Sequence, residues 1–217
     1  MNKLKTVVIV AAVVLGAGAT IPSALAASAS SSSYHWLNAS PNGTYKIDPA
    51  HTEVLFTIGH VGIVPFSGRF DKISGGYTFN NKAPRTDHVH ITIPVSSINT
   101  DFALRDKDLR GPMFFNAGRY PYITFVSTRY QPTGPKVGKL FGRLTLHGVT
   151  RQVVFHVRQK GAGSVSYLPK PWGGYLSGFV ATTTIKRSDY GMKAYLPEGL
   201  SNAVHIRVLV EGVRESQ

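Results

Sequence analysis

The most informative polar side chains in this sequence are a histidine and an arginine that fall among regularly spaced apolar residues. His60 is in phase with Ile58, and Arg187 is in phase with Ile185. Successive side chains of a strand point to opposite faces, so this spacing predicts that both polar side chains point toward the interior. A buried guanidinium needs hydrogen-bonding partners because an unpaired buried charge is costly. The two residues therefore mark polar positions inside an apolar core.

Two interpretations of Arg187 remain open from the residues alone. Together with Arg105 it offers a bidentate fork for a ligand phosphate. Alternatively it forms an internal ion pair with Asp106 or Asp189, and the nearness of these carboxylates in the sequence favours the ion pair. For His60, a hydrogen-bonded structural role is favoured over a ligand contact or a proton switch.

Signatures of catalysis and of metal binding are weak. The sequence has no Cys, no Gly-x-Ser-x-Gly and no Ser/His/Asp set whose spacing suggests a triad. His88 and His90 share one face of a predicted strand, but they lack a third ligand and that face is solvated. The few carboxylates form no obvious acid–base pair. We therefore predict a protein that is not an enzyme and has no metal site.

The elements that position these residues are predicted to be strands. Val89, Ile91 and Ile93 illustrate the period-two alternation that begins near Tyr45. Eight strands are predicted, at roughly residues 45–60, 64–80, 86–95, 121–130, 137–147, 150–160, 175–187 and 203–213. One apolar face and short links predict an all-β, antiparallel, up-and-down sheet that stacks as a sandwich or closes into a barrel. Small inward residues such as Gly142 favour a barrel that side chains alone do not fill.

One helical passage interrupts the strands within residues 97–125. Thr100 is the predicted N-cap, and Phe102, Leu109 and Met113 repeat near helical spacing before Gly111-Pro112 breaks the run. This pattern predicts a short amphipathic helix and loop that act as a plug for the sheet.

The N-terminus has the pattern of an export signal. Residues 1–26 combine Lys3 and Lys5, an apolar run at residues 7–18 and a small-x-small cleavage site at 24–26. Residues 27–43 are rich in Ser and Ala without periodicity, which predicts a flexible leader outside the fold. Residues 44–214 are then expected to form one domain around one core.

The charge of the chain is strongly positive. The formal net charge is +13, and removal of the signal's two lysines leaves 22 basic against 11 acidic residues. Such a charge suits anionic lipid head groups, nucleic acid or an acidic cell envelope. Export and the scattered distribution of basic residues argue against nucleic acid. Because an exported chain without Cys has no disulfides, its stability must come from core burial and sheet hydrogen bonds.

A series of short patterns occurs in order along the chain. They are Asp48-x-x-His51, Phe56-x-Ile58-x-His60, Gly68-x-Phe70, Ser97-x-x-Thr100, Arg105-Asp106-x-x-Leu109-Arg110, Phe114-Phe115-Asn116, Tyr120-Pro121-x-Ile123-x-Phe125, Gly142-x-Leu144-Thr145-Leu146-x-Gly148, Ile185-x-Arg187-x-Asp189-Tyr190-Gly191 and Val210-Glu211-Gly212. In this series the chain resembles the YceI-like family of periplasmic polyisoprenoid-binding proteins. It departs from the family pattern in the plug, at Asp108, at residues 111–113 and at Asn116.

The resemblance implies a lipocalin-like, eight-stranded antiparallel barrel that holds an extended isoprenoid chain, with a short helix and loop over one end. The implied function is a periplasmic binding or carrier protein for a polyprenyl phosphate or a quinone-type tail. The lipid is a bound ligand and no cofactor is expected. The residues expected to contact it are Phe56, Ile58, His60, Phe70, Ile91, Ile93, Phe102, Arg105, Met113, Phe114, Phe125, Leu144, Phe179 and Arg187.

Two other functions stay open at this point. One is an enzyme of envelope lipid or redox metabolism that uses His60 or the Arg105-Asp106 pair. The other is an envelope stress-response protein whose core is filled by side chains. Transient contact with a membrane surface and formation of a homodimer are further alternatives.

Overall fold

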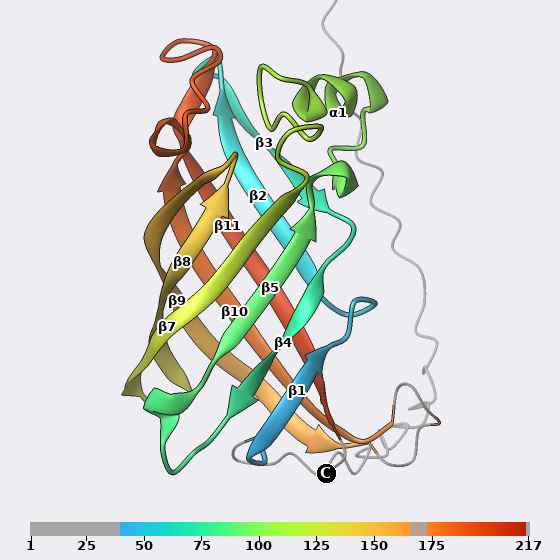
Figure 1. Cartoon of the computed structure of the whole chain (residues 1–217), viewed down its shortest axis with the longest axis vertical. Coiled ribbons are helices and arrows are strands. Elements are labelled where there is room, and N and C mark those ends of the chain that lie inside the picture. Colours follow the sequence, from blue (N-terminus) through green and yellow to red (C-terminus); the bar gives the residue numbers. More distant parts are fainter. Residues whose placement is uncertain (1–39, 166–168, 170–172, 216–217) are drawn as a thin grey trace, which may run out of the picture. The chain divides into compact units, whose positions relative to one another are not determined.

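The computed structural model describes residues 40–165, 169 and 173–215 (Figure 1). The predicted signal segment and residues 27–39 of the predicted leader lie outside the described residues. Within the described ranges, no helix has the length and apolar character needed to cross a membrane.

The described chain consists almost entirely of strands. They are β1 (Gly43–Ile47), β2 (Glu53–His60), β3 (Val64–Phe70), β4 (Ser74–Phe79), β5 (Val89–Pro94), β6 (Ile98–Asn99), β7 (Tyr122–Gly134), β8 (Val137–Leu146), β9 (Val149–Ser164), β10 (Tyr175–Lys186) and β11 (Leu200–Arg214). The α-helix α1 spans Ala103–Arg110, and three short 3-10 helices are η1 (Pro84–Thr86), η2 (Val95–Ser97) and η3 (Arg187–Tyr190).

The strands close into a barrel. Around the ring, β1, β4, β5, β7, β8, β9, β10 and β11 are neighbours in that order, and the pairing of β1 with β11 completes the circle. Tyr45 lies opposite Arg214 in this closing pair, which is antiparallel like the other seven pairs of the ring. The prediction of an all-β, eight-stranded antiparallel barrel is therefore confirmed.

Two of the predicted strands are interrupted at the same level of the barrel. Residues 48–52 separate β1 from β2, which both pair with β11, and residues 71–73 separate β3 from β4. β1 pairs with β4, and β4 pairs with β5, so these two strands belong to the closed ring. β3, in contrast, pairs only with β2 and with the two-residue β6. Figure 1 shows α1 at the end of the barrel that carries the β2–β3 turn. Residues 100–121 therefore cover the part of the wall where no described strand links β6 to β7.

The helix is short, as predicted, but it begins later than expected, at Ala103. Its N-cap is Phe102, whose side chain makes no capping bond, so the prediction of Thr100 as the N-cap is wrong. Thr100 instead donates to the Asp106 carboxylate from its backbone N–H, at 2.9 Å, and from its hydroxyl, at 2.5 Å. Within α1 only Asp106 and Leu109 are buried. The buried contacts of the helix are thus made by one carboxylate and one leucine.

The interior faces follow the predicted alternation, but the role assigned to Gly142 needs correction. Ile93, Phe125 and Leu144 are all buried in the core. A Cβ at Gly142 would collide with the ring of Phe125, and one at Gly138 would collide with that of Tyr130. The glycines therefore make room for aromatic rings from the neighbouring strand. They do not mark the unfilled space.

The end of the predicted leader belongs to the fold. Ser40 is buried, contacts the Ser177 hydroxyl and accepts a hydrogen bond from Gln159 Nε2 at 2.8 Å. The buried Tyr45 donates its hydroxyl to the Pro41 carbonyl at 2.7 Å. The expectation that the chain lies outside the fold as far as Gly43 is therefore wrong for residues 40–43.

Candidate functional site

An apolar cavity of about 540 Å³ lies inside the barrel. Apolar side chains from opposite walls, such as Ile91 and Val208, form most of its lining. The lining reaches Pro84 and Lys136 at one end of the barrel and Arg187 and Leu200 at the other. The cavity therefore extends between the two ends, and its volume lies within the range of small-molecule binding sites.

Ten of the fourteen residues predicted to contact a ligand line this cavity. They are Phe56, Ile58, Phe70, Ile91, Ile93, Phe114, Phe125, Leu144, Phe179 and Arg187. Nine of them are apolar and follow from alternation, or from the plug in the case of Phe114. Arg187 is the one charged member of the group.

The other four predicted residues lie outside the cavity wall. His60 is exposed although β2 pairs regularly with β3 as far as His60↔Val64, because it is the last residue of β2 and lies at the end of the barrel, beyond the cavity lining. Phe102 and Met113 flank α1 with exposed fractions of 55% and 60%. The expectation that these three side chains face the interior is wrong.

Arg105 is also absent from the cavity lining. Its guanidinium lies over the ring of Phe66, 4.8 Å from the ring centroid, and Nε and Nη2 donate to the hydroxyl and carbonyl of Thr100. It therefore does not reach Arg187 to form a joint phosphate fork. Its contacts tie α1 to β3 and to the residues that precede the helix.

Arg187 is 4% exposed and is held by backbone carbonyls. Nε donates to Ser201 at 2.9 Å, Nη1 to Met192 at 3.0 Å and Nη2 to Leu200 at 3.1 Å. Among the described residues, no carboxylate lies within 4.0 Å of this guanidinium. The predicted ion pair with Asp106 or Asp189 is therefore wrong.

The charge of Arg187 is consequently not neutralised by a nearby carboxylate. Burial lowers its pKa from the ordinary value, but a guanidinium keeps its proton in proteins. Arg187 is the first residue of η3, directly after β10 ends at Lys186, and this position places it at the end of the cavity. One end of an apolar cavity thus carries a fixed positive charge.

Asp87 supplies a charged group at the opposite end of the cavity. It is 7% exposed, and its Oδ1 accepts a hydrogen bond from the backbone N–H of Asn80 at 2.8 Å. Burial raises the pKa of this carboxyl to about 6. Asp87 was not among the residues predicted to contact a ligand, although it is in phase with Val89, Ile91 and Ile93 and the same alternation would have placed it inside.

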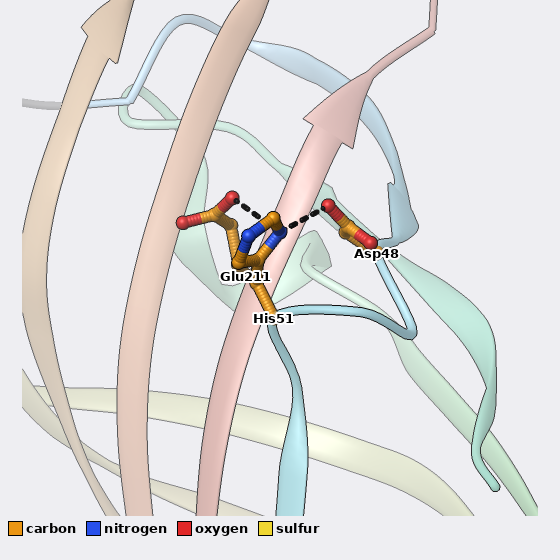
Figure 2. Close-up of side chains that lie close together, drawn as sticks. All are labelled: Asp48, His51 and Glu211. Atoms are coloured by element: carbon orange, nitrogen blue, oxygen red, sulfur yellow. Dashed lines mark hydrogen bonds and ion pairs between the residues drawn. The ribbon is translucent and has the colours of Figure 1, made fainter. Parts of the chain in front are cut away.

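A second polar cluster joins three residues where β1 gives way to β2. Figure 2 shows His51 between Asp48 and Glu211. His51 Nδ1 lies 2.8 Å from Asp48 Oδ2 and 3.7 Å from Glu211 Oε1. The three potential ligand atoms lie within 4.8 Å of one another, and an imidazole with two carboxylates is a donor set suited to a divalent cation. The sequence patterns contained all three residues but did not bring them together.

The cluster changes the proton affinities of its members. The hydrogen bond to Asp48 raises the pKa of His51, and burial raises that of Glu211. Burial opposes ionisation of Asp48, but the hydrogen bonds from His51 and from the Ala50 N–H outweigh it, so the pKa of Asp48 lies below its ordinary value. In this arrangement His51 links the segment between β1 and β2, which carries Asp48 and His51, to Glu211 on β11.

Comparison with known proteins agrees with this architecture. The YceI-like domain family matches residues 45–212. A UPF0312 protein of Pseudomonas paraeruginosa is 39% identical over 173 residues, which cover 79% of this chain and 87% of that protein. The crystal structure of Burkholderia cenocepacia BcnA superposes with a TM-score of 0.68 at 23% identity, covering 76% of this chain and 98% of BcnA.

A further solved structure has the same fold. It is a polyisoprenoid binding domain from Saccharophagus degradans, implicated in plant cell wall breakdown, with a TM-score of 0.58 at 18% identity. The match covers 79% of this chain and 98% of that domain. The family match and the identity to the Pseudomonas relative confirm the resemblance seen in the sequence patterns. The chain belongs to the YceI-like family.

Proposed function

We propose that this protein binds a long isoprenoid lipid inside its barrel and carries it in the periplasm. The observation that carries the proposal is an apolar cavity of about 540 Å³ with a buried arginine at one end. A polyprenyl phosphate or a lipid with a quinone-type tail has the matching chemistry, since each joins a long hydrocarbon chain to a polar head. The polyisoprenoid-binding role stated for the Saccharophagus domain supports this ligand class.

Burial of the tail supplies the affinity. Each isoprene unit has five carbons, and its complete burial contributes roughly 4 kcal/mol at about 0.8 kcal/mol per carbon. Association costs on the order of 4–15 kcal/mol. About four buried units therefore offset this cost even at its upper end, and further units bring useful affinity.

Arg187 is the group best placed to receive the polar head. Three of the five N–H groups of a guanidinium are engaged by the carbonyls of Met192, Leu200 and Ser201, which leaves two donors. A phosphate oxygen can accept from such donors, and its negative charge complements a buried cation that has no carboxylate partner. A phosphate head should therefore be preferred to a neutral one.

Binding explains the site better than catalysis does. Asp87 and Arg187 line opposite ends of the cavity, so they cannot act on one reacting bond. Asp106 is bonded to Thr100, and Arg105 lies outside the cavity wall. The cavity also argues against a barrel filled by side chains alone. The predicted export signal at residues 1–26 supports a periplasmic location.

Extraction of the purified protein with organic solvent, followed by mass spectrometry, tests the proposal. We expect an isoprenoid lipid to co-purify, or to be taken up when the protein is incubated with a polyprenyl phosphate. Ala181 lines the cavity, so Ala181→Phe should fill it and reduce uptake. Val126→Phe adds the same ring on an exposed outer position and serves as the control. Absence of both co-purifying lipid and uptake in the unmodified protein would falsify the proposal.

A further inference from the structure

Seven large apolar side chains are exposed at the end of the barrel that carries α1. Among the described residues ten large apolar side chains are exposed, so these seven are the majority. The seven are Val61, Ile63, Val64, Phe102, Leu104, Met113 and Tyr195, and we call them the apolar end cap. Their exposed fractions run from 47% at Val61 to 84% at Ile63. Single exposed apolar residues are ordinary, but a cluster of this size marks an interaction surface.

Direct contacts join the segments that carry the cap. The Val61 N–H donates to the Gly199 carbonyl at 2.9 Å, which ties the β2–β3 turn to the loop before β11. The rings of Tyr195 and Phe114 lie 6.0 Å apart, which ties that loop to the segment after α1. Figure 1 shows the β2–β3 turn, α1 and this loop at the same end. The cap is therefore one continuous end of the barrel.

The segment after β6 presents one side to solvent and the other to the cavity. Leu104 and Met113 are exposed, while Leu109 and Phe114, a few residues further along, line the cavity. No described strand covers this part of the wall, because β3 pairs there only with the two-residue β6. Anything that binds the cap therefore lies next to the part of the cavity wall that is formed by residues 100–121 and not by a strand.

The chemistry of the cap favours a lipid surface over a protein partner. Its side chains stand on turns, on a short helix and, for Val64, on the first residue of β3. Exposed cations at Lys107, Arg119 and Lys193 lie on α1, on the segment that follows it and on the loop 191–199. Apolar side chains bordered by Lys and Arg are typical of segments that lie in a membrane interface. Asp101, Asp108 and Glu198 are also exposed at this end. The attraction to anionic lipid therefore comes from the whole chain, whose 22 basic and 11 acidic residues leave a net charge of +11 once the two lysines of the signal are removed.

We propose that the apolar end cap inserts into the interface of a bilayer that contains anionic lipids. This places residues 100–121 against the membrane, at the part of the barrel wall where an isoprenoid tail would pass between bilayer and cavity. Only the isoprenoid as the transferred molecule rests on the proposed function. Docking itself requires nothing more than the cap and the charge.

Sedimentation with lipid vesicles tests the docking. The full mature protein is mixed with vesicles of phosphatidylcholine alone or with added phosphatidylglycerol. We expect binding to the anionic vesicles that weakens with added salt. Ile63→Ser and Leu104→Ser should each weaken it on the order of tenfold, because each removes a large side chain from the inserted surface. Val126→Ser, which removes an exposed apolar side chain from the barrel flank, should leave binding unchanged.

Other outcomes would overturn the proposal. Failure of the unmodified protein to bind anionic vesicles would do so, as would equal binding by the Ile63, Leu104 and Val126 variants. If Ile63→Ser instead converts a dimer to a monomer in analytical ultracentrifugation without affecting vesicle binding, the cap is a self-association surface.

Uptake of a polyprenyl phosphate from detergent micelles separates this proposal from the proposed function. The variants Ile63→Ser and Leu104→Ser should retain that uptake while losing vesicle binding. If the unmodified protein binds vesicles but holds no isoprenoid, the proposed cargo is wrong and the docking surface stands.

Discussion

Arg187 donates a hydrogen bond from Nη1 to the carbonyl oxygen of Met192 at 3.0 Å, across the turn that follows η3. Its other nitrogens reach the carbonyls of Leu200 and Ser201, where β11 begins. One buried side chain thereby fixes both ends of the loop 191–199, which carries Tyr195 of the apolar end cap. The stability of this end of the barrel depends on the geometry of the guanidinium.

Replacement of Arg187 by Lys should therefore destabilise the protein although it keeps the charge. A single ammonium cannot reach three carbonyls in the same directions, so at least one buried carbonyl loses its donor. Hydrogen bonds to charged groups contribute roughly 1.5–3 kcal/mol each, so we expect the free energy of unfolding to fall by about 3 kcal/mol. Urea denaturation measures this change. Arg207→Lys, at an exposed position on β11, is the control and should change little.

Gly138 should tolerate a methyl group only when Tyr130 is shortened. A Cβ at position 138 would collide with the ring of Tyr130, so Gly138→Ala should cost about 1–3 kcal/mol through overpacking. In a Tyr130→Ala background the same change should cost less, because the colliding ring is gone. A double-mutant cycle measured by denaturant unfolding gives the coupling. Additive effects of the two changes would contradict the close approach.

Asp87→Asn should stabilise the protein at neutral pH. The folded-state pKa of about 6 exceeds the ordinary value of 3.8, so the contribution of this group to stability is greatest below 3.8 and is lost as the pH rises through 6. The amide keeps an acceptor for the Asn80 N–H and removes the buried charge. We expect a gain of up to about 3 kcal/mol at pH 8 and a smaller one at pH 5, measured by urea denaturation. Asp108→Asn, at an exposed position on α1, should show no such pH dependence.

His51 should titrate above its ordinary pKa of 6.5, because the hydrogen bond to Asp48 favours the protonated ring. The stabilisation from this pair is fully present between pH 3.8 and pH 6.5, the ordinary pKa values of Asp48 and His51. It is lost as the pH rises through the folded-state pKa of His51, and also as the pH falls through that of Asp48. The imidazole side chain is 54% exposed, so solvent screening keeps the effect to about 1 kcal/mol or less. A titration of the imidazole protons by NMR gives the pKa directly. Asp48→Asn should lower the pKa of His51, and an unchanged pKa would show that the contact with Asp48 contributes nothing.

The barrel could be predicted well from the sequence, because apolar residues alternate along each strand and so identify its inner face. Ile91 and Ile93 on β5, and Val204 and Ile206 on β11, line the cavity as their spacing indicated. The interruptions at residues 48–52 and 71–73 could not be predicted in this way, because period two continues on both sides of each. At residues 71–73 the pairing partner changes, from β6 for β3 to β5 for β4.

The site was predictable where apolar side chains form it and less so where polar ones do. The carbonyls that bind Arg187 leave no mark in the sequence, whereas the neighbouring carboxylates suggested an ion pair that does not form. His60 was misplaced because alternation gives the face of a residue but not where the cavity ends along the strand, and His60 is the last residue of β2. Asp87, by contrast, could have been found by extending the alternation of β5 one step toward the N-terminus.

The pairing of β1 with β11 means that the barrel can close only late in synthesis of the chain. Residue 45 pairs with residue 214, so the ring cannot be completed until β11 has been made. A nascent chain that ends before Leu200 would leave β10 and the segment from β1 to β2 with unpaired edges, which are templates for aggregation. β11 is thus the strand that closes the ring, and the barrel can be completed only after residue 214 has been synthesised.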